Sequence, residues 1–457
     1  MRKDTMPENT SPATSANSSA ELDLPVGTNW KRNVTLFLVA QSITLFGSML
    51  VHYAIMWHIT LQTQSGTMMT MVALAGALPM FFISPFGGVW ADRFNKKLVI
   101  NIADGIIALV TLGIAAYYTI GYENMALLLV AMVVRALGQG VQMPAVSALV
   151  PQLVPQEQLL RFNGIAGSIQ SIVMFASPLA GGVLLGLMPI HALMYIDVMT
   201  AVIGISLFTF LVRVPKTSAP PAEQGIKHYF TDIKEGLAYT RTHSFVMKFL
   251  VGAAFFNIMV APASMLTPLQ VARNWGDVPW SLFGMFSLGA PQRLAAIEMS
   301  FFIGMILGGI VLGIWGGFKN KSHTMALATV MFGLGTVGLG LLNSFWLYLA
   351  CMLGIGVFLN IFNPAMMATL QVNVDQAYMG RVFSLLAMAS SLMMPLGMVL
   401  WGPLSDQVAI DWLLVGTGIA LALFGLVFVL DKTMLAAGKA AGEAEGEAAE
   451  VALAESQ

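Results

Sequence analysis

One arginine and three acidic side chains lie well inside long apolar stretches of the chain, where charged groups can do chemistry that surface charges cannot. They are Arg135, Asp104, Asp197 and Glu298. Charge is costly inside a bilayer, so such residues usually face a cavity, pair with one another or carry protons. A carboxyl group held between burial and a nearby cation can switch between its protonated and ionised forms. We therefore take all four as candidates for proton coupling, with Asp197 and Glu298 as the leading partners of Arg135. The alternative for each acid is a structural hydrogen bond between helices.

Other kinds of chemistry find little support in the sequence. The single cysteine, Cys351, excludes disulfides and cysteine-rich metal sites. No glycine-rich run continues into the G-K-[ST] of a nucleotide-binding P-loop, so ATP does not power this chain directly. A net charge of −1 gives no field that would attract nucleic acid. We expect no enzyme activity, no metal, no cofactor and no nucleic-acid partner.

Composition places these residues in a membrane. Of 457 residues, 57% are hydrophobic and 10% are charged, whereas soluble globular proteins have roughly 25% charged residues. The apolar runs are long enough to cross about 30 Å of hydrocarbon as helices, and lipid cannot satisfy the backbone of an open strand. The sequence predicts an all-α membrane protein with twelve transmembrane helices, near residues 33–59, 66–91, 98–120, 125–149, 163–188, 191–214, 244–271, 293–316, 323–343, 345–370, 384–406 and 409–431.

Polar segments divide these helices into two bundles of six, over residues 33–214 and 244–431. The composition of residues 1–32 and 432–457 predicts disordered tails, and the linker 215–243 contains the periodicity of a surface helix. Short repeats relate the bundles, which indicates two pseudo-symmetric halves. Met143-Pro144-Ala145 recurs as Asn363-Pro364-Ala365, and Gly88-Val89-Trp90 recurs as Gly313-Ile314-Trp315.

Basic residues predict the orientation, because loops that stay in the cytosol carry an excess of Lys and Arg. With the N-terminus in the cytosol, only Arg273 and Arg293 fall outside, and Arg135 lies within a helix; the other Lys and Arg residues are cytosolic. We expect a multi-pass protein of the cell inner (plasma) membrane with both termini cytosolic.

A charged turn follows the second predicted helix, and it reads Gly87-Gly88-Val89-Trp90-Ala91-Asp92-Arg93-Phe94-Asn95-Lys96-Lys97. This turn resembles the G-x-x-x-D-R-x-x-[RK]-[RK] signature of the major facilitator superfamily. The resemblance implies a cytosolic latch formed by Gly88, Asp92, Arg93, Lys96 and Lys97, in which Asp92 faces the positive start of the eleventh helix. The alternative is a topogenic anchor, which explains the lysines but not the acid.

Two further motifs are similar to those of drug:proton antiporters in this superfamily. Residues Val134 to Gly140 resemble the R-x-x-x-G/Q-G motif, with Arg135 as its arginine, and Ser177-Pro178-Leu179-Ala180-Gly181-Gly182 resembles G-P-x-x-G-G. Pro178, Gly181 and Gly182 would let helices pack closely, whether or not antiport depends on them. Across most of the chain the pattern most resembles the macrolide-efflux branch, most specifically in Met379-Gly380-Arg381-Val382-Phe383-Ser384-Leu385.

The resemblance implies a secondary active exporter of lipophilic, macrolide-like drugs that works by proton antiport and alternating access. Its partners would be a small lipophilic substrate, protons and the lipid bilayer, and we expect a monomer. An exporter of a native metabolite or siderophore would share the fold and remains an alternative. A transporter-derived sensor is a weaker one, because the loop 215–243 and the tails offer no substantial output domain.

Overall fold

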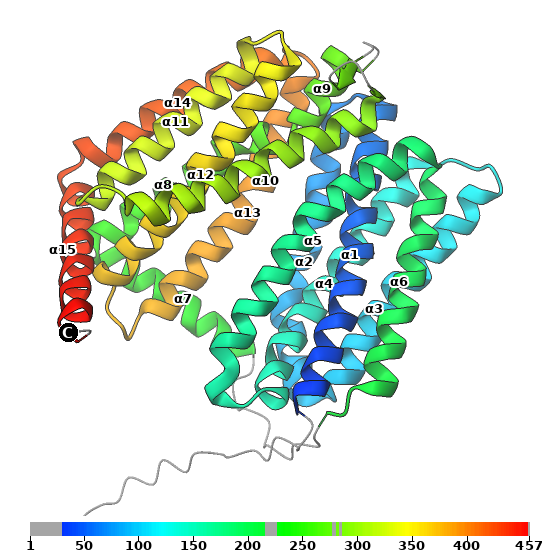
Figure 1. Ribbon diagram of the computed structural model, residues 1–457, viewed down its shortest axis with the longest axis horizontal. Helices are drawn as coiled ribbons and strands as arrows, with labels where there is room; N and C mark the ends of the chain where they lie inside the picture. Colours follow the sequence, from blue (N-terminus) through cyan, green and yellow to red (C-terminus); the bar gives the residue numbers. More distant parts are fainter. Residues whose placement is uncertain (1–29, 215–225, 277–279, 283–285, 456–457) are drawn as a thin grey trace, which may run out of the picture.

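The computed structural model describes residues 30–214, 226–276, 280–282 and 286–455, and these are almost entirely helical (Figure 1). The first half of the chain forms six long helices, with a 3-10 turn at Gln156–Gln158 before the fifth. They are α1 (Trp30–Thr63), α2 (Gly66–Arg93), α3 (Lys96–Thr119), α4 (Met125–Leu153), α5 (Leu159–Leu187) and α6 (Ile190–Leu211).

The second half repeats this arrangement after a connecting helix, α7 (Ile226–Thr242). Its helices are α8 (Ser244–Met265), α9 (Thr267–Trp275), α10 (Ala290–Trp315), α11 (Lys321–Leu341), α12 (Phe345–Asn373), α13 (Met379–Ser405), α14 (Ile410–Leu430) and α15 (Lys432–Glu455). A break at Leu266 separates α8 from α9, which together make one span, and the short antiparallel strands β1 (Trp280–Leu282) and β2 (Phe286–Leu288) precede α10. Within the described residues, twelve helical segments are long and apolar enough to cross a membrane. The predicted all-α fold of twelve transmembrane helices is confirmed.

Side-chain caps explain why several helices begin where they do. A cap residue with a short polar side chain accepts a hydrogen bond from a backbone N–H that the first turn leaves without a partner. Ser65 does this for α2, Asn95 for α3, Asn124 for α4 and Asn320 for α11. The helices therefore start at the polar breaks in the sequence.

The two halves pack by the same pattern, which confirms the predicted pseudo-symmetry. In the first half α2 packs on α4, and α3 packs on both α4 and α6. In the second half α10 packs on α12, and α11 packs on both α12 and α14. Across the molecule α2 meets α13 while α5 meets α10, so each half offers equivalent helices to the other.

The halves meet at one end of the molecule and diverge toward the other (Figure 1). We call the end that carries the α1–α2 connection the closed end, and the end that carries α7 and α15 the tail end. At the closed end, Gly66 and Thr70 of α2 lie against Gly402 of α13: a Cβ added at Gly402 would lie only 1.7 Å from Thr70 Oγ1. Only glycine permits this approach.

The prediction of a disordered tail over 432–457 is wrong for Lys432–Glu455, which form α15. This helix packs on α11, α12 and α14, and its backbone oxygens accept hydrogen bonds from Asn320, Ser322 and Asn373. The glycines that suggested a broken helix instead permit contact, because a Cβ at Gly438 would lie 2.2 Å from Ser322 Oγ. Of the other expected polar segments, 1–29 and 215–225 lie outside the described residues, and α7 occupies the rest of the linker.

Candidate functional site

Arg135 and Asp197 form an ion pair in the interior of the first half. Arg135 Nη1 on α4 lies 2.5 Å from Asp197 Oδ2 on α6, and the two residues are 4% and 2% exposed. Arg135 also donates to Thr111 Oγ1 of α3 at 3.1 Å and to the Ser48 carbonyl of α1 at 2.8 Å. Of the two partners suggested by the sequence, Asp197 therefore reaches Arg135. One guanidinium thus ties together four helices.

Asp104 lies in the same half but has a neutral partner. Its Oδ1 on α3 accepts a hydrogen bond of 2.7 Å from Gln142 Nε2 on α4, two turns from Arg135 toward the tail end. The carboxyl is buried, and this amide is its hydrogen-bond partner among the described residues. A carboxyl without a cation close by can hold a proton at lower free-energy cost than one that is ion-paired.

Glu298 stands apart from this cluster. It lies on α10 in the second half and lines a cavity of about 650 Å³ whose walls include Phe256, Phe301 and Phe332. Among the described residues its carboxyl group makes no hydrogen bond or ion pair, and the structure does not bring it to Arg135. The candidate proton sites are therefore divided between the halves.

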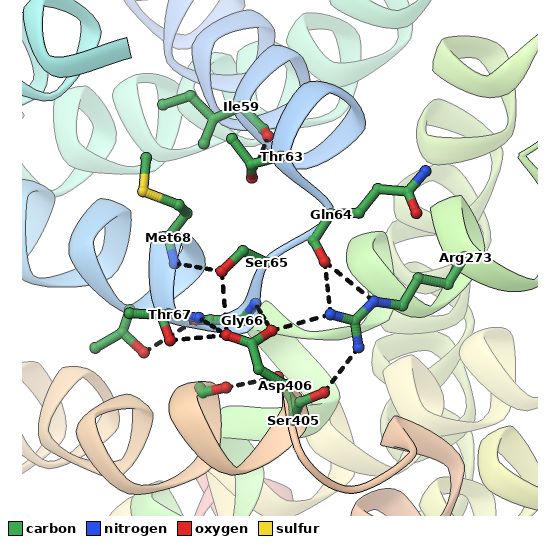
Figure 2. A network of polar contacts seen from close by, with 12 residues as sticks. Ile59, Thr63, Gln64, Ser65, Gly66, Thr67, Met68, Arg273, Ser405 and Asp406 are labelled. Atoms are coloured by element: carbon green, nitrogen blue, oxygen red, sulfur yellow. Dashed lines mark hydrogen bonds and ion pairs between the residues drawn. The ribbon is translucent and has the colours of Figure 1, made fainter.

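A cluster at the closed end, absent from the sequence-based candidates, joins the two halves directly (Figure 2). Asp406, immediately after α13, accepts hydrogen bonds from the backbone N–H groups of Gly66 at 2.6 Å and Thr67 at 2.9 Å. The hydroxyls of Thr67 and Ser65 donate to the same carboxylate at 2.7 and 3.1 Å. Asp406 thus caps the N-terminus of α2, where free N–H groups and the helix dipole favour an anion. We call this set of contacts the clasp.

Arg273 of α9 completes the clasp from the other side of the α1–α2 connection (Figure 2). Its guanidinium donates to the Gln64 carbonyl, to the Ser405 carbonyl at 2.7 Å and to Asp406 Oδ1 at 3.0 Å. Gln64 has φ 45°, a left-handed backbone that non-glycine residues seldom adopt. This strained backbone directs the Gln64 carbonyl toward Arg273. Backbone strain of this kind often occurs at functional sites.

Hydrogen bonding keeps the clasp carboxylate ionised. Burial raises the pKa of Asp406, but the hydrogen bonds from Gly66, Thr67 and Ser65 outweigh it and lower the pKa to about 2. Asp406 is therefore charged throughout the physiological pH range.

One sequence signal could have revealed Asp406. Gly402-Pro403-Leu404-Ser405-Asp406 has the same G-x-x-x-D spacing as Gly88 to Asp92, at the end of the helix that Asp92 was expected to face. Helices α2 and α13 run antiparallel, because Gly66 lies against Gly402 while Thr70, one turn later in α2, donates to the Met398 carbonyl, one turn earlier in α13. The expected latch has a counterpart at the opposite end of the same helix pair.

The residues of the expected latch lie at the tail end of α2. Asp92 is exposed and its side chain makes no hydrogen bond or ion pair with any described residue, so the latch contact is not formed in this state. Lys97 donates to the Thr209 and Val212 carbonyls at the end of α6, at 2.8 and 2.6 Å. The first turn of α13 instead meets α7, where Arg381 Nη2 lies 2.8 Å from Glu235 Oε2.

The other expected latch residues are Gly88, Arg93 and Lys96. The side chains of Arg93 and Lys96 have no hydrogen bond or ion pair within the described part of the chain. A Cβ at Gly88 would meet nothing within 4 Å, whereas one at Gly87 would lie 2.6 Å from the Gly140 carbonyl of α4. Gly87 therefore sets the packing of α2 on α4.

The proline-glycine motif of α5 lies where the two halves meet. Pro178 and Gly181 are buried, and a Cβ at Gly181 would meet only α1 of the same half. By contrast, a Cβ at Gly182 would lie 2.5 Å from Ala295 Cβ of α10. This contact is the pseudo-symmetric equivalent of the α2–α13 contact and also lies toward the closed end. The motif therefore controls the close approach of the two halves.

Two bundles of six helices, joined at one end and carrying charges inside the membrane, define a transporter of the major facilitator type. Residues 31–454 match the family model described as transmembrane secretion effector, and the chain belongs to this family of that superfamily. It is a multi-pass membrane transporter and not an enzyme.

Comparison with known proteins agrees with this assignment. The chain is 29% identical over 395 residues to macrolide efflux protein A of Streptococcus pyogenes, covering 85% of this chain and 94% of that protein. It is 21% identical to the multidrug efflux pump Tap of Mycolicibacterium fortuitum, over 88% of this chain and 96% of Tap. The crystal structure of a mutant of the nucleoside transporter NupG superposes with a TM-score of 0.67 at 15% identity, covering 87% of this chain and 99% of NupG, which shows a shared fold.

Proposed function

We propose that this protein exports lipophilic, macrolide-like antibiotics in exchange for protons, by alternating access across the plasma membrane. The likeness to macrolide efflux protein A over 85% of the chain supports the substrate class. The observation that carries the mechanism is the clasp, because it joins the halves at one end while, at the other, the side chain of the matching acid Asp92 bonds to none of the described residues.

The distribution of basic residues supports an orientation. It puts the tail end in the cytosol and the closed end outside, with both termini cytosolic. In that orientation the clasp seals the outer side, and the structure is inward-facing. The change to the outward-facing state would break the clasp and bring Asp92 to the start of α13. Asp406 and Asp92 would then each be bonded in one state and free in the other.

Proton coupling is assigned to the charges buried in the membrane. Protonation of Asp197 would remove the charge that holds Arg135, and Arg135 binds groups on α1 and α3 as well as α6. A buried cation that loses its counter-ion is strongly destabilised, so proton binding would drive these helices to rearrange. Asp104 and Glu298 offer further proton sites, one in each half.

Transport in inside-out vesicles with an imposed pH gradient tests this assignment. Arg135→Ala, Asp197→Asn and Glu298→Gln should each lower gradient-driven uptake of a labelled macrolide at normal protein levels. Full gradient-driven uptake in all three variants would reject these residues as the coupling groups. Accumulation of a panel of labelled antibiotics in whole cells, with and without an uncoupler, separates drug export from export of a native metabolite or siderophore.

A further inference from the structure

The cavity beside Glu298 lies within the second half of the protein. Its volume of about 650 Å³ falls in the range of small-molecule sites, roughly 300–1,000 Å³. Its described lining comes from the helices α8 to α14, with Met434 of α15, and includes no residue of α1–α6. A ligand could therefore be bound by one half alone.

The charges around this cavity do not cancel. Lys248, Asp431 and Glu298 line it. Lys248 Nζ lies 2.6 Å from Asp431 Oδ2 at the tail end, so these two neutralise each other. The Glu298 carboxyl has no such partner among the described residues. When ionised, it leaves the cavity with one uncompensated negative charge.

The remaining wall suits a cation with a large apolar surface. Eight phenylalanines and four methionines line the cavity, with no Tyr or Trp among the described lining residues. Phenyl faces attract cations electrostatically without offering hydrogen bonds, and methionines adapt to ligands of different shape. An anion would be repelled by Glu298, and a strongly polar ligand would lose its hydration for few hydrogen bonds.

The cavity reaches the side of the bundle at the seam between α8 and α14. These helices pack less extensively than their pseudo-symmetric counterparts α1 and α6. Val251 of α8 and Val427 of α14 line the cavity and are 60% and 42% exposed. A lipophilic molecule could thus enter from the bilayer.

We propose that this cavity binds a lipophilic monocation, with the carboxylate of Glu298 as its counter-ion and the second half as its whole binding site. The inference rests on the proposed export of lipophilic compounds and adds the charge of the ligand and the place where it binds.

Equilibrium binding to the purified full-length protein in lipid nanodiscs tests the proposal. The probes are tetraphenylphosphonium and tetraphenylborate, which have similar size and shape but opposite charge. The wild type should bind the cation more tightly than the anion. Glu298→Gln should weaken tetraphenylphosphonium binding at least ten-fold and abolish the preference for the cation, whereas Glu298→Asp should keep the preference.

Asp411→Asn provides a matched control in the same half. Asp411 accepts hydrogen bonds from Gln270 and Asn274, which an asparagine oxygen can also accept, and it does not line the cavity. This variant should bind tetraphenylphosphonium like the wild type. Unchanged binding in Glu298→Gln, or an equal loss in Asp411→Asn, would overturn the proposal.

Binding and transport can fail separately, which distinguishes this inference from the proposed function. Glu298-dependent cation binding in a protein that ignores the proton gradient would support the site and reject proton antiport. Proton-driven export in a protein whose cation binding is indifferent to Glu298 would reject the site alone.

Discussion

Arg135 holds several helices together and is also the coupling group of the proposed mechanism. Its guanidinium binds a carboxylate, a hydroxyl and a backbone carbonyl on three different helices, all inside the bundle. Breaking a buried ion pair at one partner is strongly destabilising, whereas replacing both partners by apolar groups is often neutral. Comparing a single replacement with a double replacement therefore separates the effect of the ion pair on stability from its effect on transport.

Asp197→Asn should therefore destabilise the protein by about 3–5 kcal/mol, because it leaves Arg135 charged and buried. The double variant Arg135→Met with Asp197→Leu should recover most of the thermal stability but not proton-driven transport. Thermal unfolding in detergent and vesicle uptake measure the two properties. Asp104→Asn, whose Gln142 partner is neutral, is the control and should be much milder. A double variant with normal proton-driven uptake would show that the pair is only structural.

The pKa of Asp406 predicts the pH dependence of the clasp. The free carboxyl has a pKa of 3.8 and the clasped carboxyl about 2. A lowered pKa means that the stabilisation is fully present above pH 3.8 and is lost as pH falls through about 2. Because the site is partly exposed, we expect the ionised carboxylate to stabilise the clasped state by about 1–2 kcal/mol. This corresponds to a change of roughly ten-fold in the ratio of clasped to open molecules.

Distances between spin labels on α2 and α13 at the closed end measure this effect. The wild-type distance should be constant from about pH 7 to 5 and lengthen between about pH 4 and 2. Asp406→Asn should show the longer distance more often than the wild type between about pH 7 and 5. Opening of the wild type between about pH 7 and 5 would show that another group controls this end.

Sequence reasoning found the charges that interrupt the apolar runs, but it did not find all of their partners. Arg135, Asp104, Asp197 and Glu298 stand out because each interrupts an apolar run. Gln142 and Gln64 do not stand out, since polar uncharged residues are common and their roles depend on which helix lies opposite. Asp406 is the last residue of the predicted helix 384–406, and only the folded chain places it on the N-terminus of α2, some 340 residues away.

At the scale of elements, the antiparallel pair α2 and α13 carries two equivalent acids at opposite ends. Asp406 caps α2 at the closed end, and we propose that Asp92 at the tail end caps the start of α13 in the opposite state. An acid at a helix N-terminus contributes typically about 0.3–1 kcal/mol, and up to about 2 kcal/mol when partly buried, enough to change the ratio of two states from a few-fold to about ten-fold or more.

The two acids should therefore have opposite effects on the conformational equilibrium. Asp406→Asn should favour opening at the closed end, and Asp92→Asn should disfavour it and impair export while leaving the protein in the membrane. The double variant should lie near the wild-type ratio. Alkylation of single cysteines introduced at each end, in a Cys351→Ser background, measures the populations of the states that are open at that end. Shifts in the same direction for both single variants would exclude a reciprocal pair, and unchanged export in Asp92→Asn would reduce its turn to a topogenic anchor.

The sequence does not predict α15 because its buried stripe, formed by Met434, Ala437 and Ala441, consists mainly of small residues and does not stand out in a segment rich in alanine, glutamate and glycine. Its stability comes from contacts with α11, α12 and α14 that the tail sequence alone does not reveal.

Truncation after Asp431 should lower the melting temperature by several degrees, because it removes the acceptors of Asn320, Ser322 and Asn373. Truncation after Glu447, which keeps Glu445 with its partner Lys321, should not. Equal melting temperatures for both truncations would make α15 dispensable.

At the scale of the whole molecule, the apolar runs predict the number and order of the membrane helices, since hydrocarbon demands continuous helix. The predicted ends of these helices are less accurate than their number and order. The fifth and eleventh membrane helices begin at 159 and 379, and not at 163 and 384, because their first turns are amphipathic and extend beyond the apolar run. Which end of the molecule is closed depends on a balance of small contacts between the halves and could not be predicted.

The central claim is that movement of the two halves, and with it transport, is coupled to the proton gradient. Transport by the wild type tests this claim most directly. The measurement is uptake of a labelled macrolide into inside-out vesicles that are acidic inside, with a matched sodium gradient as the alternative driving force. We expect uptake that follows the pH gradient and stops when an uncoupler dissipates it. Uptake that follows the sodium gradient and ignores pH would contradict proton antiport.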